Sequence, residues 1–375
     1  MMDTNYKNDR RGSGLKMSGI LIVSLLLAAA CGSDDNAGGS RASQADVENA
    51  GGSISVAGWQ FYQTDHQASG SVEADWSYLN TDPDILIQAR GGTANILNSS
   101  SASMSALGTL DVLQPIDTTL LSNYQSIPES LRDDPTWQNA NGDIVAVPFA
   151  VSVNVTAFDT SVVSEPTALD DLLTAEYAGG IGLFDTPDII AQIAVAQGVE
   201  DTTKITQAEF DRAMQFLVEL RPNVTAFFGF GEDVQLFNRG DIVLSLSSFG
   251  SILTEAIEQN PAIEWNLLAE TTFIDAWSVL DLESDAEALN WIDRTISAEG
   301  QTAIVDESGA YPVAPDAIEA LTAFGDPVSS KLGGLSLDEI LEQAPIARGF
   351  AAEAEGDVVT IDEATRAWND YKASF

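Results

Sequence analysis

From residue 53 to residue 375, short apolar runs typical of β-strands alternate with segments that begin on helix-capping residues. A hydroxyl residue followed three positions later by an acidic residue is a capping box, which marks the first turn of a helix. Strands that alternate with helices favour an α/β fold. We predict strands at 54–59, 144–158, 180–184, 241–245 and 276–280, and helices that start near residues 167, 185, 206, 284 and 336.

The same pattern continues through the stretch after the first strand. Here we predict a strand at 84–87, a turn through Arg90–Thr93 and a helix of small residues near 94–107. The folded part spans about 320 residues, which is long for one core and suits two lobes. We expect lobe 1 to hold residues 53–154 and about 276–322, and lobe 2 to hold residues 155–275 and about 323–375.

The first thirty residues have the features of an export signal. Four basic residues precede an apolar run from Ile20 to Ala30, which is too short to span a bilayer. Small residues stand directly before Cys31, and this junction resembles a bacterial lipobox. We therefore expect residues 1–30 to be a lipoprotein signal peptide and Cys31 to be lipidated. An ordinary cleaved signal with an incidental cysteine is the alternative.

Residues 31–52 are rich in Gly, Ser, Asn, Asp and Ala, which predicts a flexible tether. Two acyl chains on one residue anchor a protein stably. No later apolar run reaches the ~20 residues that cross a bilayer. We expect a periplasmic or cell-surface protein that is held at the membrane only through Cys31, with no intramolecular disulfide because this cysteine is the only one.

The chain is strongly acidic, with 16 basic and 57 acidic side chains and a net charge of −41. Such a surface repels nucleic acid and anionic lipid headgroups, so we expect no nucleic-acid partner. It also attracts cations. General solubility in a salty or acidic-proteome organism is the stronger explanation of the charge, so the charge alone does not indicate a cationic ligand.

Few catalytic or metal sites are compatible with this composition. His66 is the only histidine and lies in a polar stretch without a nucleophile elbow. One histidine and one cysteine are too few for a His/Cys metal site. The glycine-rich pieces lack the P-loop lysine and the Rossmann spacing. We expect no cofactor and no enzymatic activity, although a pair of carboxylates that act as a hydrolase is not excluded.

Several segments together resemble the solute-binding proteins of polyamine-type ABC importers, the spermidine/putrescine-binding family. Each segment is short, but they occur in the family's order and cover most of residues 53–375. They are Gly58–Tyr62, Leu113–Asp117, Asn141–Phe149, Pro222–Phe227, Phe237–Ile242, Ser248–Ser251, Phe273–Trp277 and Glu307–Val313.

This resemblance implies a two-lobe, periplasmic-binding-protein-like fold of type II, in which two α/β lobes close on a ligand. It also implies delivery of a small solute, most simply a polyamine or related amine, to an ABC permease. We expect the protein to be a monomer. An ammonium group needs oxygen acceptors and a counter-charge, and aromatic rings add a cation–π attraction.

The resemblance also assigns candidate ligand-binding residues. Asp275 matches the amine-anchoring aspartate, and Phe273 its aromatic neighbour. Trp59 matches the aromatic residue of the first lobe, and Tyr311 a late tyrosine. Three acidic residues lie near other polar contacts of the family, although a helix-capping role is the alternative for the first; they are Asp185, Asp188 and Glu355.

The chain departs from the family in the first lobe and at one later position. Phe61 stands where the family has a glutamate, and Ser248 replaces an aromatic residue. Arg90–Gly92 replaces a pair of tyrosines, and the stretch from Trp59 to Asp84 is too short for the family's first long helix, which predicts a trimmed first lobe. We keep Phe61 and Arg90 in the predicted site, because Arg90 beside a helix N-terminus could hold an anionic group.

These departures leave the ligand open between an amine and a zwitterionic or anionic organic solute. Two other classes of function remain as alternatives. A carboxylate-based hydrolase needs two carboxylates that face each other across a water. A surface interaction protein needs an exposed apolar face on the first lobe.

Overall fold

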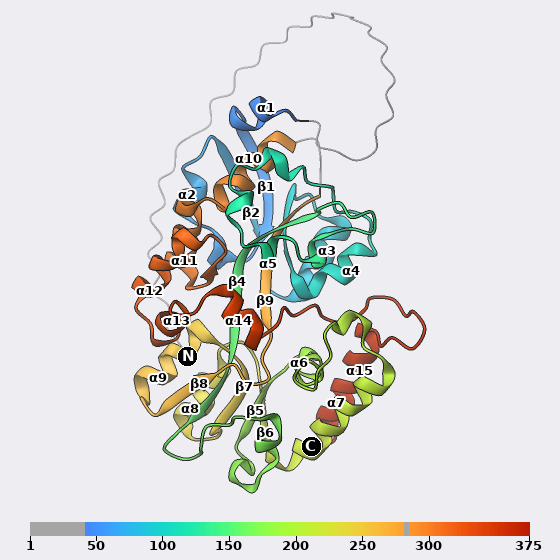
Figure 1. Cartoon of the computed structure of the whole chain (residues 1–375), viewed down its shortest axis with the longest axis vertical. Coiled ribbons are helices and arrows are strands. Elements are labelled where there is room, and N and C mark those ends of the chain that lie inside the picture. Colours follow the sequence, from blue (N-terminus) through green and yellow to red (C-terminus); the bar gives the residue numbers. More distant parts are fainter. Residues whose placement is uncertain (1–41, 281–284) are drawn as a thin grey trace, which may run out of the picture. The chain divides into compact units, whose positions relative to one another are not determined.

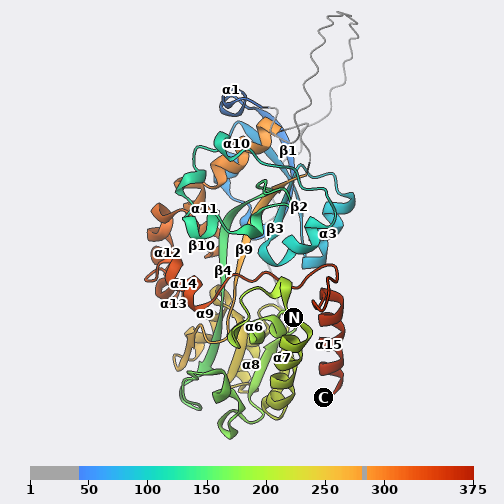
Figure 2. The same cartoon turned by 45° about the vertical axis from the view of Figure 1, so that its right-hand side comes forward.

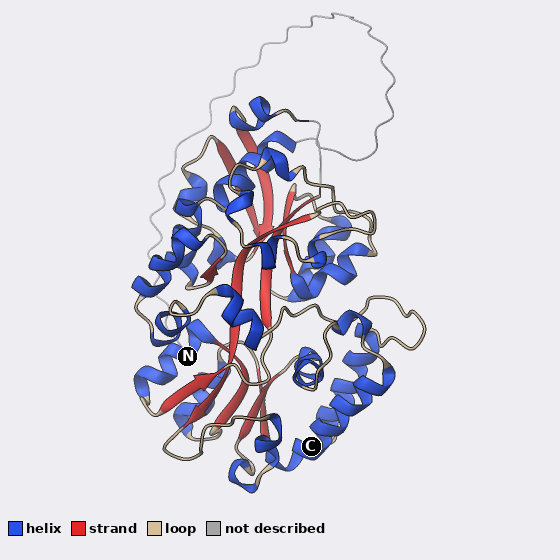
Figure 3. Ribbon diagram, viewed as in Figure 1, coloured by secondary structure: helices blue, strands red, loops and turns tan. Residues whose placement is uncertain are grey.

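The computed structural model describes residues 42–280 and 285–375, and these residues belong to one compact unit. The predicted signal peptide and Cys31 lie outside the described residues. Ten strands belong to one continuous sheet that curves through the unit (Figures 1 and 3). They are β1 Gly52–Gly58, β2 Val72–Tyr78, β3 Ile96–Ser100, β4 Ala146–Asp159, β5 Ile181–Phe184, β6 Val224–Phe228, β7 Leu244–Phe249, β8 Ile263–Asn266, β9 Thr272–Val279 and β10 Tyr311–Pro312.

The sheet consists of two half-sheets with the same strand order. The first half-sheet runs β2-β1-β3-β9-β4, and the second runs β6-β5-β7-β4-β8. In each, three parallel strands are followed by one antiparallel strand, which is β9 in the first half-sheet and β4 in the second. The chain passes from the first half-sheet to the second along β4 and returns along β9. Each of these two strands is the antiparallel strand of the half-sheet that it enters. This arrangement confirms the predicted two-lobe α/β fold.

Strand β4 joins the two half-sheets. Residues 146–153 pair with β9, and residues 154–158 pair with β7. We call the point where β4 passes from one half-sheet to the other, between residues 153 and 154, the crossing. The register shifts between Pro148 and Ala150 and again between Val155 and Ala157, so an irregularity lies on each side of it. Bulges increase the local twist of a strand, which lets one strand serve two half-sheets. Figures 1 and 2 both show β9 beside β4 along this crossing.

Helices cover both half-sheets (Figure 1). The predicted capping boxes at Thr206 and Ser336 are present, and each hydroxyl accepts a hydrogen bond from the backbone N–H three residues on. The α-helices are α1 Gln44–Glu48, α2 Asp65–Ala68, α3 Asp82–Gly91, α4 Met104–Gly108, α5 Glu129–Arg132, α6 Asp188–Ala196, α7 Gln207–Leu220, α8 Glu232–Arg239, α9 Gly250–Gln259, α10 Asp285–Thr295, α11 Ala298–Ser308, α12 Ile318–Phe324, α13 Pro327–Leu332, α14 Leu337–Gln343 and α15 Ile361–Ala373.

Two hydrophobic cores stabilise the unit. The first surrounds the upper half-sheet of Figure 1 and includes a stack of Phe149 on Trp277, whose ring centroids are 4.1 Å apart. The second lies between β5, α6, α7 and α15 and includes Leu217 and Trp368. The predicted lobe 2 is split between them, because α9 and β8 pack into the first core.

The structure corrects the predicted end of the tether. Residues 44–48 form α1, and β1 already starts at Gly52. Ser43 and Asp46 make a capping box, Val47 is buried, and the Asn290 side chain donates to its carbonyl. The small, polar composition of the segment hid this local signal.

The predictions for residues 84–107 were wrong. Residues 84–87 lie in α3, where the Asp84 carboxylate accepts the backbone N–H groups of Asn80 and Thr81 and caps the helix. Residues 96–100 are β3, which is buried between β1 and β9 although its sequence is partly polar. The connection from Trp59 to β2 contains only a single turn and the four-residue α2, as the short stretch predicted.

Candidate functional site

The carboxyl ends of the parallel strands of both half-sheets lie at the crossing. Ser100, the last residue of β3, pairs with Asp275, which pairs in turn with Ala150 of β4. Phe249, the last residue of β7, pairs with Asn154. Positions 150 and 154 are about 13 Å apart along an extended strand. Ligands of open α/β sheets bind at the carboxyl ends of strands, so this junction is the candidate site.

Asp275 is the central charged residue at the junction. Its side chain is buried, with 7% of the residue exposed. The Tyr62 hydroxyl donates to one carboxylate oxygen at 2.8 Å, and the Asn98 amide donates to the other at 3.1 Å. Both donors are neutral groups that orient the carboxylate. The sequence analysis placed Asp275 in the site but assigned no role to Tyr62, which follows β1, or to Asn98, which lies in β3.

The protonation state of Tyr62 follows from its surroundings. Burial, followed by the charge of Asp275, raises the pKa of the Tyr62 phenol well above its ordinary value. The Ser152 hydroxyl lies 3.3 Å from the Tyr62 oxygen and acts in the opposite direction. Tyr62 therefore keeps its proton at neutral pH and remains a donor to Asp275.

Aromatic rings lead from Asp275 to the surface of the first half-sheet. Phe61 packs edge-on against Tyr62 with centroids 4.6 Å apart, and Trp59 lies parallel to Phe61 at 6.2 Å. Phe61 is 43% exposed and Trp59 is half-buried. The structure thus brings the predicted residues Trp59, Phe61 and Asp275 together through Tyr62. Phe273 lies two residues before Asp275 on β9, half-buried and paired with Ser152.

A second aromatic group lies at the strand ends of the other half-sheet, and sequence reasoning missed it. Phe184 and Phe249 end β5 and β7, and their ring centroids are 5.3 Å apart. Phe230, just after β6, packs on Phe249 at 4.5 Å and is 59% exposed. The sequence signal was present, because a phenylalanine ends each of the three parallel strands; the third is the buried Phe228.

The acidic residues predicted in this half-sheet already have partners inside the protein. Asp185 follows β5 directly and accepts from the indole N–H of Trp368 at 2.9 Å and from the ammonium of Lys372. Both partners lie on α15. Asp188, the first residue of α6, accepts from the hydroxyl of Thr186 at 2.9 Å. Asp188 therefore makes the local contact of a helix start, whereas Asp185 is held by an indole N–H and an ion pair rather than in the helix-capping role that was its alternative to ligand binding.

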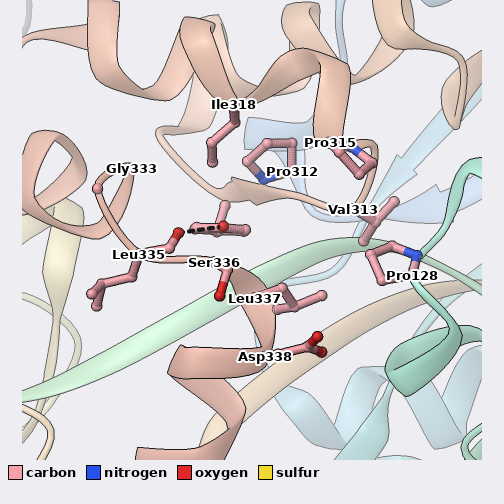
Figure 4. A pocket seen from close by; sticks show the side chains of 12 residues that line it. Pro128, Pro312, Val313, Pro315, Ile318, Gly333, Leu335, Ser336, Leu337 and Asp338 are labelled. Carbon is pink, nitrogen blue, oxygen red and sulfur yellow. Dashed lines mark hydrogen bonds between the residues drawn. The ribbon is translucent and has the colours of Figure 1, made fainter.

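Tyr311 lies in a different environment from Asp275. It lines a pocket of about 420 Å³ with Pro312, Pro315 and the start of α14 (Figure 4). Its hydroxyl donates to the carbonyl of Leu335 at 2.8 Å. Burial raises the pKa of Tyr311 to about 12. The described contacts of Tyr311 therefore belong to the packing of the first core.

The other two predicted site residues, Arg90 and Glu355, are exposed. Arg90 occupies the last turn of α3, and the expectation of a helix N-terminus beside it was wrong, because residues 84–91 are helix and residues 96–100 are strand. Glu355 lies in an exposed loop before α15. Ser248 is buried and shares a short hydrogen bond with Ser245. His66 lies in α2, and burial lowers its pKa.

A buried polar network supports the strand ends at the crossing. The carboxyl of Glu270 accepts from the backbone N–H of Ser247 at 2.9 Å and from the hydroxyl of Thr156 at 2.8 Å. Ser247 in turn accepts from the side-chain amides of Asn154 and Gln192, each at 2.8 Å. Burial raises the pKa of Glu270 to about 8. This network fixes the backbone two residues before Phe249.

Two features are absent from the described residues. Within residues 42–280 and 285–375, no three or more His, Cys, Asp or Glu side chains gather where they could hold a metal ion. In the same part of the chain, no helix has the length and apolar character that a membrane crossing requires.

A family model described as bacterial extracellular solute-binding protein matches residues 71–330. The chain belongs to this family. No curated protein matches the sequence. The match runs from β2 into α13, so it includes every described strand except β1, and with them the crossing.

Solved structures share the fold at low sequence identity. The spermidine/putrescine substrate-binding protein PotD of Streptococcus pneumoniae is 15% identical, with 86% of this chain and 98% of that chain covered and a TM-score of 0.67. A putative spermidine/putrescine ABC transporter protein of Listeria monocytogenes is 15% identical, with 86% and 99% covered and a TM-score of 0.66. The TpPotD lipoprotein of Treponema pallidum is 15% identical, with 86% and 99% covered and a TM-score of 0.64.

Proposed function

We propose that this solute-binding protein captures an organic amine, a polyamine or a related compound, and delivers it to an ABC importer. The buried carboxylate of Asp275 carries this proposal. It lies at the strand ends where ligands of such folds bind, and two neutral donors hold it in place. An ammonium group brought to this carboxylate gains a charge-assisted hydrogen bond.

The rings beside Asp275 suit the carbon part of an amine. Trp59 and Phe61 lead from the carboxylate toward solvent, and both retain exposed ring surface. Methylene groups that cover these rings leave water, and an ammonium near a ring face gains a cation–π attraction of about 0.5–2 kcal/mol. The printed names of two similar structures, which refer to spermidine and putrescine, support the same ligand class.

The alternatives have less support from the described contacts. An anionic ligand would rely on Arg90, which is exposed at the end of α3 rather than beside a helix N-terminus. A hydrolase would need a second carboxylate opposite Asp275, but Asp275 faces a phenol and an amide. We therefore propose a binding protein without enzymatic activity that acts as a monomer.

We also propose that the mature chain is lipidated at Cys31 and acts outside the cytoplasmic membrane. The family description supports an extracellular location, and one similar structure is a lipoprotein by its name. Metabolic labelling with a palmitate analogue tests the anchor. The wild-type chain is expected to be labelled and membrane-associated, and Cys31→Ser is expected to lose the label. A labelled Cys31→Ser chain would contradict the assignment.

The binding proposal is tested by calorimetric titration of residues 38–375, the unit that contains both cores and all described strands. At least one of spermidine, putrescine and phenethylamine is expected to bind, and Asp275→Asn is expected to weaken it at least about tenfold. The control is Glu73→Gln, which removes the same charge from an exposed position of edge strand β2. Absence of binding by every amine, or equal losses in the two variants, would contradict the proposal.

A further inference from the structure

We propose that residues 345–352 form a strap that sets the angle between the two halves of the unit, and that the Arg348 guanidinium is its latch. Each half is one half-sheet with its covering helices. The strap is a third passage between them, in addition to β4 and β9. It leaves α14, whose Ile340 belongs to the first core, and reaches α15, whose Trp368 belongs to the second. Figures 1 and 2 both show this segment running between the two halves.

The strap begins beside the start of β9. Ile346 forms a parallel bridge with Thr272, the first residue of that strand. The backbone N–H of Ala347 donates to the Thr272 carbonyl at 2.9 Å, and the Thr272 N–H donates to the Pro345 carbonyl at the same distance. The Thr272 hydroxyl donates to the carbonyl of Ala344 at 2.7 Å. The strap is therefore fastened to one of the two strands that connect the half-sheets.

Arg348 then contacts both halves. Its Nη2 donates to the Asp134 carboxylate at 2.5 Å and its Nε to the Thr136 hydroxyl at 3.2 Å, in the segment that carries Trp137 into the first core. Its Nη1 donates at 3.4 Å to the carbonyl of Glu200, in the connection between α6 and α7. The Asp134 side chain is only 9% exposed and that of Arg348 22%. The ion pair is therefore sheltered, unlike the exposed pairs that contribute little.

The two residues after the latch contact opposite halves. Gly349 has φ of 65°, and a Cβ at this position would lie 2.6 Å from the carbonyl oxygen of Ala102, just after β3. The strap backbone thus approaches the first half as closely as glycine permits. Phe350 is 3% exposed and packs edge-on against Phe210 of α7, with ring centroids 6.1 Å apart. A rotation of one half against the other therefore acts on the strap from two sides.

The latch bonds depend on the placement of the two halves. A guanidinium is planar and presents its donors in fixed directions. The acceptors around Arg348 come from both halves, so they match these directions in one relative placement only. Closure of a two-lobed binding protein is a rotation about a few backbone positions. Such a rotation must break or exchange the charge-assisted bond to Asp134 or the bond to Glu200. The latch holds the present angle until the halves move.

Pulsed electron paramagnetic resonance on ligand-free residues 38–375 tests the latch without any choice of ligand. This unit contains both cores and lacks Cys31, the chain's only cysteine. Spin labels at Glu73→Cys on β2 and Glu219→Cys on α7, both exposed positions, then report the distance between the halves. The parent chain is expected to give one narrow distribution. Arg348→Met is expected to broaden it or shift its maximum by several ångströms, with unchanged far-UV circular dichroism.

Asp134→Asn is the second variant, because it keeps an oxygen for the Thr136 backbone N–H and loses the charge that Arg348 holds. It should broaden the distribution in the same way, and the double variant should add nothing further, as expected of two groups that act through one contact. The matched control is Arg239→Met, which removes a guanidinium paired with Asp241 two residues away and should change nothing. A parental distribution in Asp134→Asn, or equal broadening by Arg239→Met, would overturn the proposal, whether or not Arg348→Met folds.

Discussion

Tyr62 donates a hydrogen bond of 2.8 Å to Asp275, a residue 213 positions further along the chain. The bond joins the turn after the first strand of the first half-sheet to β9, which enters that half-sheet only after the chain has built most of the second. The orientation of the Asp275 carboxylate therefore depends on correct pairing of β9 within the first half-sheet. Its geometry also depends on the phenol keeping its proton, which burial and the neighbouring charge ensure.

We expect Tyr62→Phe to weaken both the fold and the amine affinity. The change removes one buried donor from Asp275 and leaves the ring packing against Phe61 and Phe149 in place. The free energy of unfolding is expected to fall by about 1–2 kcal/mol. Amine affinity should fall several-fold, because the carboxylate is held by fewer donors. Urea denaturation and calorimetry measure the two effects.

Tyr78→Phe is the matched control for that experiment. The Tyr78 hydroxyl also donates to a side chain, Gln63, but the residue is 44% exposed. Water replaces an exposed hydrogen bond at little cost, so this variant should change neither quantity appreciably. Equal effects of the two substitutions would show that the Tyr62–Asp275 bond has no special role.

Glu270 predicts a pH dependence of stability. Burial raises its pKa to about 8 in the folded protein, against an ordinary value of 4.5. Below pH 4.5 both states hold the proton, and the shift has no effect. Between about 4.5 and 8 the unfolded chain releases the proton while the folded protein keeps it, so this group progressively destabilises the fold as pH rises, by a few kcal/mol in all. Above pH 8 the effect is constant.

Glu270→Gln tests this assignment, because an amide keeps an acceptor for Ser247 and Thr156 but does not titrate. Urea denaturation at pH 5 and pH 8 should show Glu270→Gln gaining stability relative to the wild type as pH rises. Glu264→Gln, at an exposed position of β8, should show no such trend. If the free energies of unfolding of the wild type and Glu270→Gln differed by the same amount at pH 5 and pH 8, Glu270 would titrate normally.

Ala269 has a backbone conformation that alanine rarely adopts, with φ of 54°. It precedes Glu270 in the second passage between the half-sheets. Glycine has no Cβ to clash in the left-handed region, so Ala269→Gly is expected to raise the free energy of unfolding by about 0.5–1 kcal/mol. Ala262→Gly, at a position without positive φ, should lower it instead. If both glycines destabilised the protein alike, left-handed strain at Ala269 would not be significant.

Local signals in the sequence were sufficient to predict the two-lobe α/β fold. Capping boxes such as Thr206 with Glu209 are local, and the long apolar run of β4 is unmistakable. The run at 84–87 was misread because its apolar residues are contiguous, and only the Asp84 cap marks it as helix.

The partners of Asp275 and Asp185 depend on long-range register, which a single sequence does not specify. Asn98 meets Asp275 because β3 pairs with β9, and Lys372 meets Asp185 because α15 returns to the second half-sheet at the end of the chain. In the sequence, Asp275 matched the family's amine-anchoring aspartate and Asp185 only lay near another acidic position, but the partners of both residues were beyond prediction. The fold separates them into one that two neutral groups orient and one that an ammonium compensates.

Lys372→Met should change which amines bind. The ammonium of Lys372 compensates Asp185, whose side chain is 41% exposed, so its removal leaves a partly exposed negative charge at the strand ends of the second half-sheet. That charge adds a counter-ion for a second ammonium group at the strand ends of the second half-sheet. We expect putrescine affinity to rise several-fold while phenethylamine affinity changes little, because an exposed ion pair contributes little to stability and the rings remain in place.

Lys204→Met, which removes an ammonium paired with Asp201 at an exposed position, should alter neither affinity. A putrescine affinity that did not respond to Lys372→Met would mean that Asp185 lies out of reach of a ligand held at Asp275.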